Sequence, residues 1–168
     1  MGIINKLQQL GKTDLIAILD VAGNKQKALI GYLDEVQNAL DKSANLIISL
    51  NQEINGLNFD MNTCLSQKSQ SDKTFFDSLN SYDELLMKQA MEESIKYGEC
   101  ASNNRIKLNA KTAMLDKLNF YNNILQQKYD FIISKQDMIV KNYSVIKYEI
   151  LQQLNEISSV LDSYKGTD

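Results

Sequence analysis

A regularly spaced apolar seam is the feature that most restricts how this chain can fold. Between Leu15 and Cys64 apolar residues recur at alternating intervals of four and three, interrupted only by the polar Gln26 and Ser43, and the 168-residue chain contains no proline. The seam consists of Leu15, Leu19, Ala22, Gln26, Leu29, Leu33, Val36, Leu40, Ser43, Ile47, Leu50, Ile54, Leu57, Met61 and Cys64. Such spacing averages 3.5 residues per turn and keeps one stripe of a helix against a partner helix. The seam therefore predicts one long coiled-coil-like helix.

We expect this helix to span residues 13–68, with Thr13 as its N-cap. Gly23, Gly31 and Gly56 lie inside that range. Each costs about 1 kcal/mol relative to alanine, which the sustained seam is expected to outweigh. Residues 1–12 form a short amphipathic segment ahead of the long helix.

The seam weakens in the polar stretch that follows Cys64. We expect a break near residues 66–81, with residues 69–81 forming a turn or a short helix. Ser81 and Glu84 match a capping box, which places the start of the next helix at Ser81. The second helical arm then covers residues 82–165 and is weakened near 98–104, around Gly98 and three consecutive polar residues.

The second arm has a wider apolar face than the first. Beside its near-heptad stripe runs a second one, spaced by seven: Ile124, Phe131, Met138 and Val145. A face this wide implies more than one partner helix. The predicted fold is all-α: a single elongated domain over 1–168, built as a long antiparallel helical hairpin. Packing of a short extra helix, or oligomerisation, would complete a three- or four-helix bundle.

The two cysteines suggest how the arms pair. The midpoint between Cys64 and Cys100 is residue 82, next to the predicted cap at Ser81. A hairpin turning there sets residue i opposite residue 164 minus i, so that Leu33 faces Phe131 and Leu15 approaches Ile150. The same register brings the cysteines together and favours a Cys64–Cys100 disulfide. The alternative is two separate buried thiols.

The chain lacks the usual groups of an active site. It has no histidine, and its adjacent acidic pairs point in different directions on a helix. We therefore expect no catalytic residue, no cofactor and no metal. A net charge of −3 with a single arginine argues against nucleic-acid binding, and no apolar run is long enough to span a membrane. The first residues also lack a secretion-signal pattern.

These observations favour a non-enzymatic structural or assembly protein, a helical rod that packs with copies of itself or with a partner. The alternative is a secreted or surface-exposed helical binding module, such as an adhesin, a secretion-filament tip or a helical partner of a secreted protein. Expected partners are other protein helices, in a homo-oligomer, filament or lattice. The interface candidates are Phe75, Phe76, Leu79, Tyr129, Phe131, Met138 and Tyr148.

If the disulfide forms, an extracytoplasmic or secretory compartment follows. An acidic, proline-free coiled-coil chain with few cysteines is similar in general composition to the matrix proteins of ciliate secretory granules. It is also similar in that respect to helical secreted proteins of AT-rich bacteria.

Overall fold

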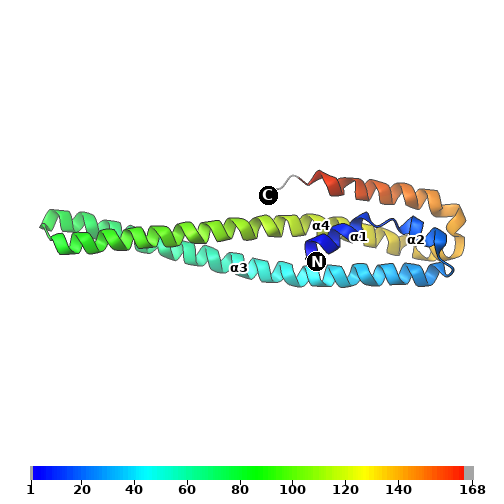
Figure 1. Ribbon diagram of the computed structural model, residues 1–168, viewed down its shortest axis with the longest axis horizontal. Coiled ribbons are helices and arrows are strands. Elements are labelled where there is room, and N and C mark those ends of the chain that lie inside the picture. Colours follow the sequence, from blue (N-terminus) through cyan, green and yellow to red (C-terminus); the bar gives the residue numbers. More distant parts are fainter. Residues whose placement is uncertain (1, 165–168) are drawn as a thin grey trace. The chain divides into compact units, whose positions relative to one another are not determined.

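The computed structural model describes residues 2–164, which are almost entirely helical and contain no strand. The elements are α1 (Ile3–Lys12), α2 (Leu15–Val21), α3 (Lys25–Ser81), α4 (Glu84–Ser159) and a 3₁₀ turn, η1 (Val160–Ser163). The predicted all-α fold with a long antiparallel pair, α3 and α4, is confirmed (Figure 1). The chain divides into two compact units: unit 2 is Ser49–Met114, and unit 1 combines the described residues up to Ile48 with those from Leu115 on.

The predicted long helix over 13–68 is interrupted near its start. Helix α2 ends at Val21, and α3 begins at Lys25 after a short connection that contains Gly23. Asn24 caps α3, because its side-chain oxygen accepts a hydrogen bond from the Lys27 N–H at 3.0 Å. The prediction of one uninterrupted helix is therefore wrong at this point, because a glycine followed by a good N-cap residue outweighs the apolar spacing.

The N-cap of α2 is Asp14 and not Thr13. The Asp14 carboxylate accepts a hydrogen bond from the Ala17 N–H at 3.0 Å. The Thr13 hydroxyl instead donates to the Gln9 carbonyl oxygen at the end of α1, also at 3.0 Å. The predicted short N-terminal segment is helical from Ile3 and continues through Gly11 to Lys12.

The turn between the long helices lies where the cysteine midpoint placed it. Tyr82 takes a left-handed conformation with φ of 54°, and the Asp83 N–H donates to the Ser78 carbonyl at 3.2 Å. Asp83 then caps α4 by accepting from the Leu86 N–H at 3.1 Å. The predicted capping box is wrong, because the Ser81 hydroxyl donates back to the Ser78 carbonyl at 3.2 Å.

Two predicted weak points are regular helix. Residues 69–81 belong to α3 without a break, and residues 98–104 lie inside α4. Both stretches are polar but contain no proline, so no backbone group obliges the helix to end. Tertiary pairing of the two helices outweighs their modest helix propensity.

Helix α4 reverses direction at Asn142, whose backbone is non-helical with φ of −135° and ψ of 41°. The segment after Asn142 runs back beside the segment before it (Figure 1, orange to red). Lys135 pairs with Glu149 at 3.6 Å, and the rings of Phe120 and Tyr164 lie 5.0 Å apart. The predicted continuous arm over 82–165 is therefore wrong, and the end-to-end hairpin register cannot extend past this reversal.

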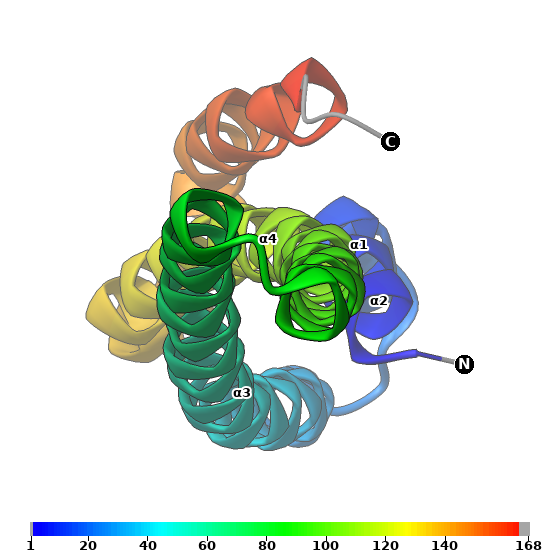
Figure 2. The same cartoon turned by 90° about the vertical axis from the view of Figure 1, so that its left-hand side faces the viewer.

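Unit 1 encloses a large apolar core. In both views the middle of α4 lies between the start of α3 and the returning C-terminal segment (Figure 2). Helices α1 and α2 pack against that segment: the Ser158 hydroxyl donates to the Gly11 carbonyl at 3.1 Å, and Lys12 pairs with Asp162 at 3.0 Å. These segments cover part of the wide apolar face of α4: in its second stripe Ile124 is buried, whereas Met138 and Val145 are 44% and 78% exposed. The fully buried large apolar side chains of unit 1 are Leu7, Leu15, Leu19, Leu29, Leu118, Leu125, Ile132, Ile139, Ile150 and Leu161.

Unit 2 is a two-helix hairpin with a thin interior. Apart from Leu50, its buried residues are small: Cys64, Ser71, Ser78, Ala90 and Ala101. Burial of such side chains removes little apolar area from water, so each contributes little stability. Within this unit the predicted register of 164 minus i is confirmed, because Glu53 pairs with Lys111 at 2.7 Å and Cys64 is bonded to Cys100.

Candidate functional site

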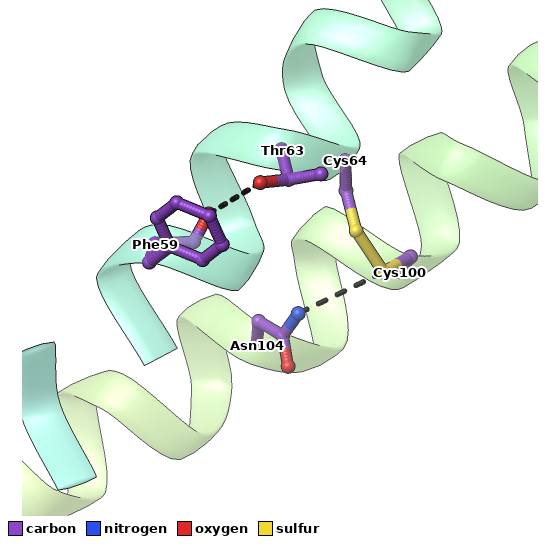
Figure 3. The surroundings of a disulfide bond; sticks show 5 residues. All are labelled: Phe59, Thr63, Cys64, Cys100 and Asn104. Carbon is purple, nitrogen blue, oxygen red and sulfur yellow. Dashed lines mark hydrogen bonds between the residues drawn. A yellow bond between two sulfur atoms is a disulfide. The ribbon is translucent and has the colours of Figure 1, made fainter. Parts of the chain in front are cut away.

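The disulfide in unit 2 joins the two helices directly. Cys64 on α3 and Cys100 on α4 are bonded, with their Cα atoms 6.1 Å apart, which confirms the predicted pairing (Figure 3). The Asn104 amide donates a hydrogen bond to the Cys100 sulfur at 3.7 Å. Because the buried residues around it are small, the disulfide is the strongest single link between the helices of this unit.

One side of the hairpin is polar. The Glu53–Lys111 ion pair and a hydrogen bond from the Ser71 hydroxyl to the Glu93 carboxylate, at 3.4 Å, cross between the helices on this side. Lys111 donates to Glu53 and so lowers the pKa of that carboxyl. A shallow groove here is lined by small residues, Gly56 and Ala110, beside those charges. Leu57 also lines this groove, so the polar contacts on this side flank a small apolar floor.

The opposite side of the hairpin carries exposed apolar side chains. It is marked by a hydrogen bond from the Ser94 hydroxyl to Asp72 and by the Lys68 side chain, which lies against Gly98. Residues one turn or one heptad away from these markers share their side of the helix. Those residues form what we call the apolar face of unit 2: Leu65, Phe76, Leu79, Met91 and Ile95.

The exposure of the apolar face is high for such side chains. Phe76 is 64% exposed, Ile95 57% and Met91 49%, while Leu79 and Leu65 are 43% and 40% exposed. Single exposed apolar residues are common on protein surfaces, but several on one side of two paired helices are typical of an interaction site.

The predicted interface residues fall into two groups. Phe75, Phe76 and Leu79 lie together near the end of α3, with the two phenylalanine rings 5.7 Å apart and Phe75 half-buried. The other four belong to unit 1, where Tyr129 and Phe131 are half-buried and Met138 and Tyr148 are exposed. Sequence reasoning missed Met91 and Ile95, although both follow from the confirmed register.

Unit 1 contains a buried lysine that the sequence did not single out. The Lys128 ammonium donates to the carbonyl oxygens of Leu10, Gly11 and Thr13, at 3.2, 3.1 and 2.7 Å. The Tyr32 hydroxyl also donates to the Leu10 carbonyl, at 2.9 Å. These carbonyls lie at the end of α1, where a helix leaves its last acceptors unpaired and favours a cation.

The surroundings of Lys128 shift its pKa. Burial lowers the pKa of this ammonium to about 8, against an attraction from Asp14 that opposes the shift. Burial also raises the pKa of the Tyr32 hydroxyl. All three ammonium hydrogens are used on backbone carbonyls, so the group serves to hold α1 and is not free for a ligand.

A second polar cluster links α2 to the C-terminal segment. The Tyr143 hydroxyl and the Lys147 ammonium both donate to Asp20, at 2.7 and 2.8 Å. Lys147 and Tyr143 lower the pKa of the Asp20 carboxyl, while burial and Asp20 raise that of Tyr143. Each of these three side chains is hydrogen-bonded to another member of the cluster, which is typical of a structural network.

The described residues show neither a metal-binding cluster nor a membrane-spanning helix. Across residues 2–164, no group of three or more Cys, Asp or Glu side chains is arranged to hold a metal ion. In the described part of the chain, no helix combines the length and the apolar character that crossing a membrane requires. Comparison with protein-family models, with curated proteins and with solved structures finds no match to this chain.

Proposed function

We propose that this protein is a non-enzymatic structural or assembly protein whose unit 2 hairpin packs against helices of other protein molecules. The observation that carries the proposal is the apolar face of unit 2. In unit 1 the chain's own segments bury part of the apolar surface of α4, with Ile132 and Ile139 each 0% exposed. In unit 2 the apolar face has side chains that are 40% to 64% exposed.

The physical argument rests on how little unit 2 buries by itself. Two isolated helices that enclose mainly alanine, serine and cysteine gain little from the hydrophobic effect. A further helix laid on the apolar face would bury Phe76, Met91 and Ile95 together. Helix-on-helix packing of this kind suits a protein that builds an assembly, and it requires no catalytic group.

The second candidate function is a secreted or surface-exposed helical binding module. The Cys64–Cys100 disulfide favours it, because structural disulfides persist in oxidising compartments. Labelling of free thiols in intact cells of the source organism, with and without prior reduction, tests this candidate. Labelling that needs no prior reduction would contradict an oxidising location.

Site-specific photo-crosslinking tests the proposed function. A photoreactive phenylalanine analogue placed at Leu79, on the apolar face, should give covalent adducts with protein when the chain is expressed in its source cells. The matched control position is Phe59, which is 72% exposed in the same unit but lies on the outer side of α3 (Figure 3). Equal adduct yields at the two positions, or none at Leu79, would contradict the proposal.

A further inference from the structure

We infer that the Cys64–Cys100 disulfide is a redox switch for the end of the unit 2 hairpin. Residues 65–99, which we call the tip segment, lie between the two cysteines and contain the turn at Tyr82. While the disulfide is formed, the two helices of the tip segment stay paired. When a dithiol reduces the disulfide, the tip segment opens and unit 1 stays folded.

The tip segment has almost no apolar interior of its own. Its buried residues are Ser71, Ser78 and Ala90, whose side chains remove little apolar area from water. Most of the stability of a helix in a protein comes from the packing of its apolar face, so the pairing gains little from this interior. The least exposed large apolar side chains of the tip segment are only half-buried: Phe75, Met87 and Tyr97.

The polar contacts across the tip segment are also weak. The Ser71 hydroxyl donates to the Glu93 carboxylate at 3.4 Å, and the Ser94 hydroxyl donates to the Asp72 carboxylate. Glu93 is exposed and Asp72 is half-buried, so water competes for both carboxylates. Hydrogen bonds that replace bonds to water stabilise a fold only modestly. The disulfide is therefore the main constraint that keeps these two helices together.

Unit 1 does not depend on this covalent link. Both cysteines lie in unit 2, whereas unit 1 has its own core, in which Leu118 and Ile132 are 0% exposed and Leu125 is 1% exposed. Segments that bury little open locally while well-packed parts of the same protein stay folded. Opening of the tip segment therefore shortens α3 and α4 at the ends nearest to Tyr82 and leaves unit 1 intact.

The reduction is an ordinary thiol–disulfide exchange. Cys100 is half-buried and Cys64 is 6% exposed, so the more accessible attack is at the Cys100 sulfur. A thiolate of the dithiol bonds to that sulfur, the bond between the cysteines breaks, and Cys64 leaves as a thiolate. The second thiolate of the reductant then displaces Cys100 and closes a disulfide within the reductant. Two electrons thus pass to the cysteines, which take up protons from water.

The switch also controls the apolar face of unit 2. Every residue of that face lies in the tip segment: Leu65, Phe76 and Leu79 come from α3, and Met91 and Ile95 come from α4. The face exists only while the two helices are paired, so reduction takes it apart. This consequence for a partner rests on the proposed function, whereas the opening of the tip segment does not.

Hydrogen–deuterium exchange of the purified full chain, measured by mass spectrometry of its peptides, tests the switch. The oxidised chain is compared with the chain reduced by dithiothreitol. We expect reduction to speed the exchange of tip-segment amides about a hundredfold, because the cross-link no longer restricts the open form. Amides around Leu125 and Ile132 in unit 1 should exchange at an unchanged rate.

The double variant Cys64→Ser/Cys100→Ser is the matched control. Its tip segment should exchange as fast as that of the reduced chain, and dithiothreitol should leave this rate unchanged. Tip-segment exchange that does not respond to reduction would overturn the inference. An equal acceleration in unit 1 would also overturn it, because the chain would then unfold as a whole. The experiment needs no partner, so its failure is distinct from an absence of adducts at Leu79, which contradicts the proposed function.

Discussion

Lys135 and Glu149 form an ion pair across the reversal at Asn142, with 3.6 Å between their side-chain nitrogen and oxygen. The pair shows that α4 folds back on itself, so the chain covers part of the wide apolar face of its own second arm. Exposed apolar side chains remain in both units: Phe76 and Ile95 in unit 2, and Val145 and Tyr148 after the reversal in unit 1.

Removing the disulfide should destabilise unit 2. In the chain-entropy model, a link between residues 36 apart stabilises by roughly 3 to 4 kcal/mol. The double variant Cys64→Ser/Cys100→Ser should therefore unfold at lower urea concentration than the oxidised protein, as followed by circular dichroism. Adding reductant should shift the unchanged protein in the same direction and leave the variant unaffected. Equal midpoints for the oxidised protein and the variant would contradict this prediction.

Stability should rise with pH above 8 because of Lys128. The folded protein releases the Lys128 proton near pH 8, whereas the unfolded chain holds it up to about 10.5. Between these values the unfolded state binds more protons, so the free energy of unfolding increases with pH. From pH 7.5 to 9.5 we expect a gain of about 2 kcal/mol.

Urea unfolding at the two pH values measures this gain. Lys128→Met should remove most of the pH dependence, because methionine fills a similar volume without a titrating group. Lys141→Met, at an exposed position in the same helix just before Asn142, should retain the pH dependence. A pH dependence that persists in Lys128→Met would show that another group is responsible.

Acid should weaken the contact between α2 and the C-terminal segment through Asp20. Hydrogen bonds from Lys147 and Tyr143 hold the pKa of this carboxyl below its ordinary value of 3.8. A carboxyl with a lowered folded pKa stabilises the protein above its unfolded pKa and loses that contribution as pH falls through the folded value. Asp20→Asn should therefore show a smaller loss of unfolding free energy below pH 4 than the unchanged protein, as measured by denaturant titration.

Periodicity predicted which residues are buried but not what buries them. The stripe that contains Ile139, Ile146 and Ile150 passes through Asn142 with regular spacing, so nothing in the pattern marks the reversal. Asparagine there is neither a proline nor a glycine, and the reversal is established by the non-helical backbone of Asn142 and by the pairing of Lys135 with Glu149. Apolar spacing is the same whether a helix continues or doubles back.

Helix-capping residues and the cysteine pair were more informative than apolar spacing about where helices begin and turn. The midpoint of Cys64 and Cys100 located the turn at Tyr82, because a disulfide fixes the register of a hairpin. Gly23 followed by Asn24 marks the helix start that the seam obscured. Lys128 gave no signal, since its carbonyl partners are more than a hundred residues away in sequence.

Two glycines in different surroundings should respond oppositely to alanine. A Cβ added at Gly56, inside α3, meets nothing within 4 Å, whereas one at Gly11 lies 3.0 Å from a Leu161 methyl carbon. Gly56→Ala should raise the free energy of unfolding by about 0.5 to 1 kcal/mol, because alanine restricts the unfolded chain and favours helix. Gly11→Ala should lower it, because buried Leu161 must move.

Thermal unfolding of the two variants, followed at the same wavelength and scan rate, checks this pair. Gly31→Ala is the matched control in unit 1, since its Cβ also meets nothing within 4 Å, and it should behave like Gly56→Ala. If Gly11→Ala were stabilising to the same extent as these two, the packing of α1 against η1 would have to be looser than the Gly11–Leu161 contact indicates. The comparison therefore tests the interior of unit 1 independently of any partner.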